Sequence, residues 1–121
     1  MRPTQLVLTL GLLIVPSLEA QTPADSAAIR EAVIDYVDGW WTGDAERMAR
    51  CLHPSLVKRR IFPHRDTGRS LMQSDTKNDL VEYTRAGGGS DRPDEKGEVN
   101  VSILALDGDI ATVAASSDRY V

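Results

Sequence analysis

The sequence predicts a single α+β domain, because helical periodicity dominates its first half and strand-like alternation appears in its second half. Apolar residues recur at intervals of three and four between positions 29 and 41, and they alternate with polar residues at 56–62 and again from 99. The chain has 121 residues, of which 41% are hydrophobic and 26% charged, as expected for one modest globular domain. No internal repeat divides it.

The first 20 residues have the features of a removable export signal. Arg2 supplies the positive start, Leu6 to Val15 form an apolar run, and Leu18-Glu19-Ala20 resembles a cleavage site. A spanning helix needs roughly 20 apolar residues, so this run favours cleavage over a stable membrane anchor, with an uncleaved anchor as the alternative. We therefore expect an exported protein, periplasmic or secreted, with a signal peptide at 1–20 and the domain at 21–121.

Two helices are expected next. After a loose lead-in over 21–24, Asp25 or Ser26 can cap a helix that ends near Thr42. Its apolar stripe consists of Ile29, Ala32, Val33, Tyr36, Val37, Trp40 and Trp41. Neighbouring helical residues point about 100° apart, so only one of the adjacent tryptophans can face fully inward, and Trp40 follows the stripe better. A second helix should run from about Asp44 to Leu52, before Pro54.

Period-two alternation then predicts a strand in which Val57, Arg59 and Ile61 share one face. The opposite face carries Leu56, Lys58, Arg60 and Phe62. Residues 63–75 are expected to form turns. Thr76 and Asp79 resemble a capping box that opens a helix to about Arg85, with Leu80, Val81 and Tyr83 as its packing residues, and glycines 87–89 end it.

The last segment predicts a β-hairpin, with strands over 99–105 and 110–115 and a turn at Asp107-Gly108-Asp109. Two registers are open: a turn at Asp107-Gly108 pairs Ala105 with Ile110, and a turn at Gly108-Asp109 pairs Asp107 with Ile110. Because the chain stops inside an apolar strand, we expect a truncated domain.

Several segments carry a family resemblance that covers roughly residues 26–121. They are Asp35-Tyr36-Val37-Asp38-Gly39-Trp40 with Gly43-Asp44, Leu52-His53-Pro54 with Lys58-Arg59-Arg60, Leu80-Val81-Glu82-Tyr83-Thr84, and Asp118-Arg119-Tyr120-Val121. With them the chain resembles the nuclear transport factor 2-like superfamily, most closely the group named putative lumazine-binding proteins. The resemblance implies a cystatin-like cone with N-terminal helices on a curved antiparallel sheet. Members continue after such a Tyr-Val step, so it also implies that C-terminal strands are missing and the domain is incomplete.

Composition and spacing argue against several function classes. The formal net charge of −4 makes nucleic acid a poor partner, because phosphate binding draws on positive surfaces. His53 and His64 are the only histidines and match no compact metal spacing, so we expect no metal. Gly87–Gly89 do not open a helix after a strand, so they form no phosphate-binding loop, and no cofactor is expected. Cys51 is the only cysteine and cannot form an intramolecular disulfide.

The candidate ligand-binding residues are Tyr36, Trp40, Arg59 and His53. Tyr36 and Trp40 would form a stacking wall, although a plain hydrophobic core also explains them. Arg59 shares its face with apolar residues and would complement an anion, although an exposed strand face or an internal salt bridge explains it too. His53 is a nominal acid or base, or simply the residue that ends a helix.

We therefore expect the protein to bind a small aromatic or anionic organic molecule without transforming it. One alternative is a dimerisation or scaffold module with a filled cone, which leaves a homodimer open. The other is a lyase or isomerase in which His53 or Tyr36 carries a proton. Catalysis is the weaker expectation, because no carboxylate falls on an inward strand face to complete an acid–base pair.

Overall fold

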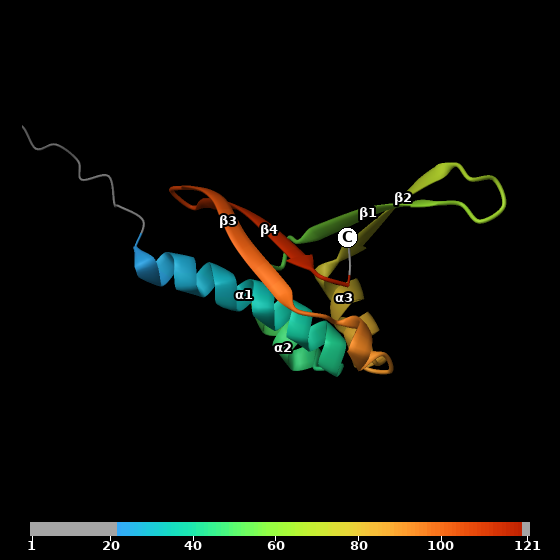
Figure 1. Cartoon of the computed structure of the whole chain (residues 1–121), viewed down its shortest axis with the longest axis horizontal. Helices are drawn as coiled ribbons and strands as arrows, with labels where there is room; N and C mark the ends of the chain where they lie inside the picture. The colour runs from blue at the N-terminus through green and yellow to red at the C-terminus, as the bar shows by residue number, and fades with distance from the viewer. Residues whose placement is uncertain (1–21, 120–121) are drawn as a thin grey trace, which may run out of the picture.

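A computed structural model describes residues 22–119, and its element arrangement is shown in Figure 1. The expected signal peptide (1–20) and the final Tyr120-Val121 lie outside these residues. In chain order the elements are α1 (Pro23–Thr42), α2 (Ala45–Cys51), β1 (Val57–Pro63), β2 (Ser70–Thr76), α3 (Lys77–Arg85), the short 3₁₀ helix η1 (Pro93–Glu95), β3 (Val99–Asp107) and β4 (Ile110–Ser117). Both hairpins are antiparallel, so the predicted α+β class is confirmed.

Helix α1 begins at Pro23, three residues earlier than a helix capped by Asp25 would begin. Thr22 is its N-cap, and Asp25 completes a capping box in which each residue accepts a hydrogen bond from the backbone N–H of the other. Proline is favoured at the first helical position because its missing N–H would have no helical partner there. The expected loose lead-in is therefore wrong, and Asp25 is the third helical residue instead of the cap.

The buried core lies where α2 packs against α1 and α3, and its residues are Ala45, Met48, Leu52, Leu80 and Val81. Asp44 caps α2 as predicted, since its Oδ1 accepts from the Arg47 N–H at 2.9 Å. Tyr36 and Trp40 of α1 pack against the edge of this core and stay half-buried. The core therefore lies on the helical side of the molecule, and one side of α1 lies outside it.

The capping box of α3 is confirmed, with Thr76 as N-cap and Asp79 as its partner. Leu80 and Val81 are buried as predicted, but Tyr83 is 47% exposed. Thr84 takes the buried place, and its hydroxyl donates to the Leu80 carbonyl at 2.7 Å. The reason is helical geometry: at about 100° per residue, position 84 lies between the buried positions 80 and 81 around the helix axis, whereas 83 is rotated out of this sector toward solvent.

The segment expected to consist of turns contains strand β2, which pairs antiparallel with β1. Ile61 lies opposite Met72, and Phe62 opposite Leu71. Polar residues break the alternation in β2, so the sequence pattern hides a strand that is held mainly by pairing with β1. Figure 1 shows this hairpin projecting away from the helices.

The β3–β4 hairpin takes the second of the two open registers, with Asp107 opposite Ile110 and Gly108-Asp109 at the turn. Gly108 has a φ of 53°, the left-handed region that such a turn requires. The register shifts between Ile103 and Ala105, so Leu104 bulges outward and is exposed. As a result Leu106 returns to the half-buried side, and the hairpin lies along α1 (Figure 1).

None of the helices within residues 22–119 is both long enough and apolar enough to cross a membrane.

Candidate functional site

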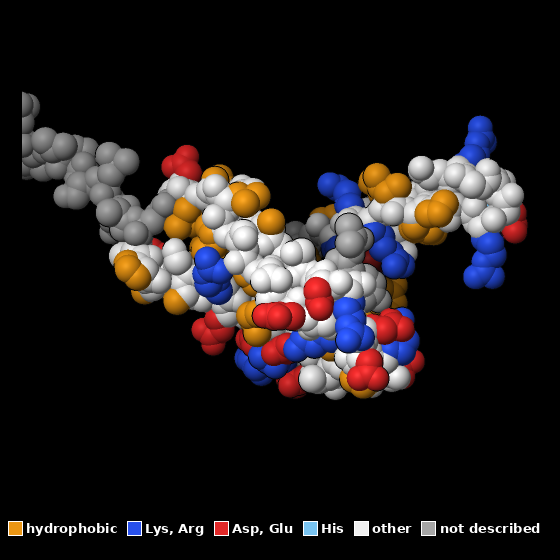
Figure 2. All heavy atoms as spheres, viewed as in Figure 1, with side chains coloured by type: hydrophobic (Ala, Val, Ile, Leu, Met, Phe, Trp, Pro, Cys, Tyr) orange, Lys and Arg blue, Asp and Glu red, His pale blue; other side chains and the backbone are white. Residues whose placement is uncertain are grey.

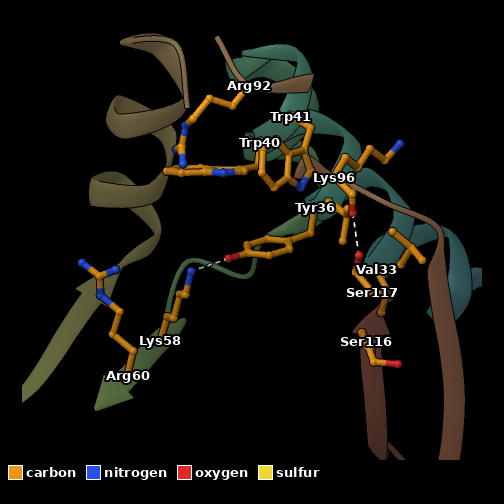
Figure 3. Close-up of a pocket in the computed structure, with 13 residues that line it drawn as sticks. Val33, Tyr36, Trp40, Trp41, Lys58, Arg60, Arg92, Lys96, Ser116 and Ser117 are labelled. Carbon is orange, nitrogen blue, oxygen red and sulfur yellow. Dashed lines mark hydrogen bonds between the residues drawn. The ribbon is translucent and has the colours of Figure 1, made fainter. Parts of the chain in front are cut away.

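A cavity of about 680 Å³ lies between α1, the start of β1, the segment after α3 and the paired ends of β3 and β4. Figure 3 shows the residues that line it: Val33, Tyr36, Val37, Trp40, Trp41, Lys58, Arg60, Arg92, Lys96, Val99, Ala115, Ser116 and Ser117. Three of these are aromatic and all come from α1. Four others are cationic, and they come from two separate segments.

Both tryptophans line the cavity, whereas the sequence predicted that only Trp40 would face inward. The glycine segment after α3 explains this difference. The Gly89 N–H donates to the Trp40 carbonyl at 2.9 Å, and a Cβ on Gly89 would collide with the Trp41 ring. The glycines that end α3 therefore also let its C-terminal loop pack against the two indoles, which keeps both of them half-buried.

Lys58 connects β1 to the aromatic side chains of α1 through its contact with Tyr36. Its Nζ donates to the Tyr36 Oη at 2.7 Å and lies 5.4 Å from the centre of the Tyr36 ring (Figure 3). The phenol is a neutral partner, so this contact leaves the positive charge of Lys58 uncompensated. No carboxylate within residues 22–119 forms an ion pair with it.

Arg60, on the same strand, is also hydrogen-bonded to an uncharged side chain. Its Nε and Nη2 donate to the Gln73 Oε1 at 3.1 and 2.7 Å, and its guanidinium lies 5.5 Å from the centre of the Phe62 ring. Gln73 in turn donates to the Asp75 carboxylate at 2.7 Å. An uncharged amide thus separates Arg60 from that acid, and among the described residues Arg60 has no direct carboxylate partner.

The two cations on the other side are neutralised by nearby acids. Lys96 forms an ion pair with Asp38, and Arg92 forms ion pairs with Asp91 and Glu95. The Lys96 carbonyl also accepts a hydrogen bond from the Ser117 hydroxyl at 2.6 Å, which ties this segment to the end of β4 (Figure 3). The cavity is therefore electrically asymmetric, because its uncompensated positive charge lies on the β1 side.

Of the residues predicted from sequence, Tyr36 and Trp40 lie together in the cavity, but Arg59 and His53 do not line it. Arg59 is exposed, because strand alternation turns it away from the side on which Lys58 and Arg60 face the cavity. His53 is exposed after α2, and its Nδ1 accepts from the Ser55 N–H at 3.1 Å.

The sequence indicates no ligand role for Lys58, Arg60, Arg92 or Lys96, and of the two adjacent tryptophans it favours Trp40 over Trp41. For the two β1 cations a signal was present, since both share the strand face of Leu56 and Phe62. Choosing between the two faces requires knowing where the helices lie. No comparable signal exists for Arg92 and Lys96, which lie in a polar loop and at its end.

The cavity offers stacking surfaces, hydrogen-bond donors and positive charge. Among residues 22–119, Tyr36 is the only tyrosine in the lining, and no histidine or carboxylate side chain belongs to it. Within residues 22–119 no group of three or more histidine, cysteine, aspartate or glutamate side chains could hold a metal ion. This arrangement is suited to recognising a flat molecule with an acidic group.

Comparison with known protein families identifies the family of this chain. No similar protein was found among the curated proteins, and none was found among the solved structures. Residues 24–120, which include every residue of the cavity lining, match the family described as "Putative lumazine-binding". The α+β arrangement is consistent with the nuclear transport factor 2-like superfamily, and the chain belongs to this putative lumazine-binding family.

Proposed function

We propose that the protein binds a small, planar aromatic molecule with an anionic group in the 680 Å³ cavity and does not transform it. The observation that carries this proposal is the pairing of one aromatic wall, Tyr36, Trp40 and Trp41, with the uncompensated cations Lys58 and Arg60. Membership of a family described by small-molecule binding supports it.

The electrical asymmetry suggests how the ligand lies. Its acidic group belongs on the β1 side, where a new anion gains from Lys58 and Arg60 without competing with a protein carboxylate. Its ring belongs against α1, where indole and phenol faces supply stacking. Its uncharged polar edge belongs near Ser116 and Ser117. The Ser116 hydroxyl can donate or accept, whereas the Ser117 hydroxyl already donates to the Lys96 carbonyl and can only accept.

We also propose that binding takes place outside the cytoplasm, as the features of residues 1–20 suggest. Sequencing the N-terminus of the protein recovered from the periplasm or medium tests this: a start near residue 21 supports export with cleavage. An intact Met1 in a cytoplasmic fraction would contradict it.

The binding proposal is tested first by native mass spectrometry of gently purified protein, which reports any small molecule retained from the host.

A direct titration follows with two fluorescent probes that share an arylated naphthylamine skeleton. One is 1-anilinonaphthalene-8-sulfonate, and the other is the uncharged N-phenyl-1-naphthylamine. We expect both to quench tryptophan emission, with the sulfonate binding about tenfold more tightly, which corresponds to about 1.4 kcal/mol.

Equal affinity for the two probes would contradict an anion-selective cavity, and no quenching by either probe would contradict binding at the tryptophan wall. The second outcome would favour a scaffold module in which the sheet packs against a partner. That alternative is supported by large apolar residues exposed on β1 and β2, above all Ile61 and Met72.

A further inference from the structure

The β1–β2 hairpin exposes apolar side chains on both of its faces. Ile61 is 74% exposed and its cross-strand partner Met72 is 65% exposed. The neighbouring pair, Phe62 and Leu71, points to the opposite face and is also exposed. Large apolar side chains grouped on a projecting ribbon are unfavourable in water and mark a contact surface.

This hairpin is also basic, although the whole protein is acidic. Lys58 and Arg60 line the cavity, and the other charged residues over 57–76 are Arg59, Arg65 and Arg69 against Asp66 and the buried Asp75, whereas the full chain has a net charge of −4. Figure 2 shows Lys and Arg side chains at the far end of the projection, beyond hydrophobic ones. The hairpin therefore combines exposed apolar surface with positive charge.

A groove of about 290 Å³ lies at the opposite end of the molecule, between the start of α1 and the turn of β3–β4 (Figure 1). Its lining combines apolar and acidic residues: Asp25, Ala28, Ile29, Leu106, Gly108, Asp109, Ile110 and Ala111. Ile110 is 73% exposed at its rim. The capping hydrogen bonds of Asp25, first that from the Thr22 N–H, hold its pKa below the ordinary value, so Asp25 brings a negative charge to the groove.

We propose that the β1–β2 hairpin of one copy docks into this end groove of a second copy. The two surfaces are complementary, since a basic apolar projection meets an acidic apolar recess. They lie at opposite ends of one chain, so a molecule cannot satisfy its own groove with its own hairpin. Such a contact joins two different surfaces and is heterologous, which leads to rings or open chains instead of a closed two-fold dimer.

The apolar side chains supply most of the attraction, and the charges supply its orientation. Exposed ion pairs contribute little and are screened by salt, so the association should be weak and should weaken further as ionic strength rises. The groove has room for one or two large side chains, which suits insertion of hairpin side chains instead of the whole ribbon.

The proposal is tested by analytical ultracentrifugation of two variants, each of which has one of the two docking surfaces disrupted and the other intact. A groove variant carries Asp109→Lys with Ile110→Lys, and a hairpin variant carries Arg69→Glu with Met72→Glu; all four positions are exposed and none lines the 680 Å³ cavity. We expect the wild-type mass to rise with protein concentration, while each variant alone stays monomeric. Mixed together, the variants should form a 1:1 dimer and nothing larger, because each retains one working half.

The control is Arg50→Glu, an exposed charge reversal on α2 away from both surfaces, which should associate like the wild type. Circular dichroism confirms that each variant is folded, and the naphthalene probes confirm that its cavity still binds. The proposal is overturned if the wild type stays monomeric, if either variant alone associates as the wild type does, or if the folded mixture gives no heterodimer. A two-fold dimer that survives both sets of changes would show a different interface.

Discussion

Lys58 and Tyr36 are 22 positions apart in the sequence, yet the lysine ammonium donates a hydrogen bond of 2.7 Å to the tyrosine hydroxyl. This contact joins β1 to α1 at the cavity wall. Because tyrosine is uncharged at neutral pH, the pair leaves a full positive charge beside an aromatic surface. Lys58 thus joins the strand to the helix, and in the proposed function it supplies charge that attracts an anionic ligand.

Replacing Lys58 with methionine keeps a long, unbranched side chain but removes the positive charge. We expect the Lys58→Met variant to bind the sulfonated naphthalene probe about tenfold more weakly, because a hydrogen bond to a charged group contributes about 1.5–3 kcal/mol. Affinity for the uncharged probe should change little. The matched control is Arg59→Met on the next residue, which does not line the cavity. An equal loss in both variants, measured by fluorescence titration, would show that general electrostatics and not this contact governs binding.

The glycines after α3 should be sensitive to substitution for a steric reason. Gly88 has a φ of 55°, and a Cβ there would collide with the Trp40 carbonyl oxygen. Gly68 has a similar φ of 66° but no atom within 4 Å of such a Cβ. We expect Gly68→Ala to cost about 1–2 kcal/mol from backbone strain alone. Gly88→Ala should cost clearly more in urea unfolding and should alter tryptophan emission, and identical costs would contradict this packing role.

The capping box of α3 predicts a change in acid stability. The Thr76 N–H and hydroxyl donate to the Asp79 carboxylate at 2.7 Å each, and these bonds hold the pKa of Asp79 below its ordinary value. A carboxyl whose folded pKa lies below its unfolded pKa stabilises the fold above about pH 4, and this stabilisation is lost as the pH falls through the folded pKa.

We therefore expect Asp79→Asn to lower stability at neutral pH and to flatten the decline between about pH 4 and pH 2, as measured by urea midpoints across that range. The control is Asp66→Asn in the exposed loop between β1 and β2. Thr76→Ala should cost about 1 kcal/mol at neutral pH through loss of the same cap. An Asp79→Asn profile parallel to the wild type would rule out the linkage.

Cys51 should react slowly with alkylating agents in the folded protein. Its thiol donates to the Met48 carbonyl at 3.3 Å, and burial raises the pKa of the thiol above its ordinary value. Alkylation requires the thiolate, so iodoacetamide at pH 8 should modify the native protein much more slowly than the urea-unfolded chain. The stabilising effect of this neutral thiol is complete below the unfolded pKa, about 8.5, and is lost as the pH rises through the folded value. Equal rates in both states would show that the thiol is freely accessible.

Local features of the fold could be predicted from the sequence with good accuracy. Both α2 and α3 begin after the residues chosen as caps, and the last hairpin turns within the expected residues. These features depend on hydrogen bonds between residues three or four positions apart. The start of α1 differs from the prediction even so, because Thr22 and Asp25 form a capping box in which Thr22, and not Asp25, is the N-cap.

Non-local features could not be predicted in the same way. Strand β2 is not evident in the sequence because it depends on pairing with β1. The sequence leaves the register of β3 with β4 open, because Asp107-Gly108 and Gly108-Asp109 are both good turn sequences. The sequence favoured Arg59 as the ligand cation, and the cations that line the cavity are Lys58 and Arg60. The reason is that alternation defines two faces of a strand without saying which one the helices cover.

The sequence by itself determined the α+β class, all three helices and the aromatic stripe on α1, because helix caps and side-chain periodicity are properties of short stretches of chain. Only the tertiary structure decided that Lys58 and Arg60, and not Arg59, accompany Tyr36 and Trp40 in the cavity. It also separated cations that already have acidic partners, such as Lys96 with Asp38, from those that do not. The physical reason is that electrostatic pairing depends on distances across the fold, which strand and helix patterns do not contain.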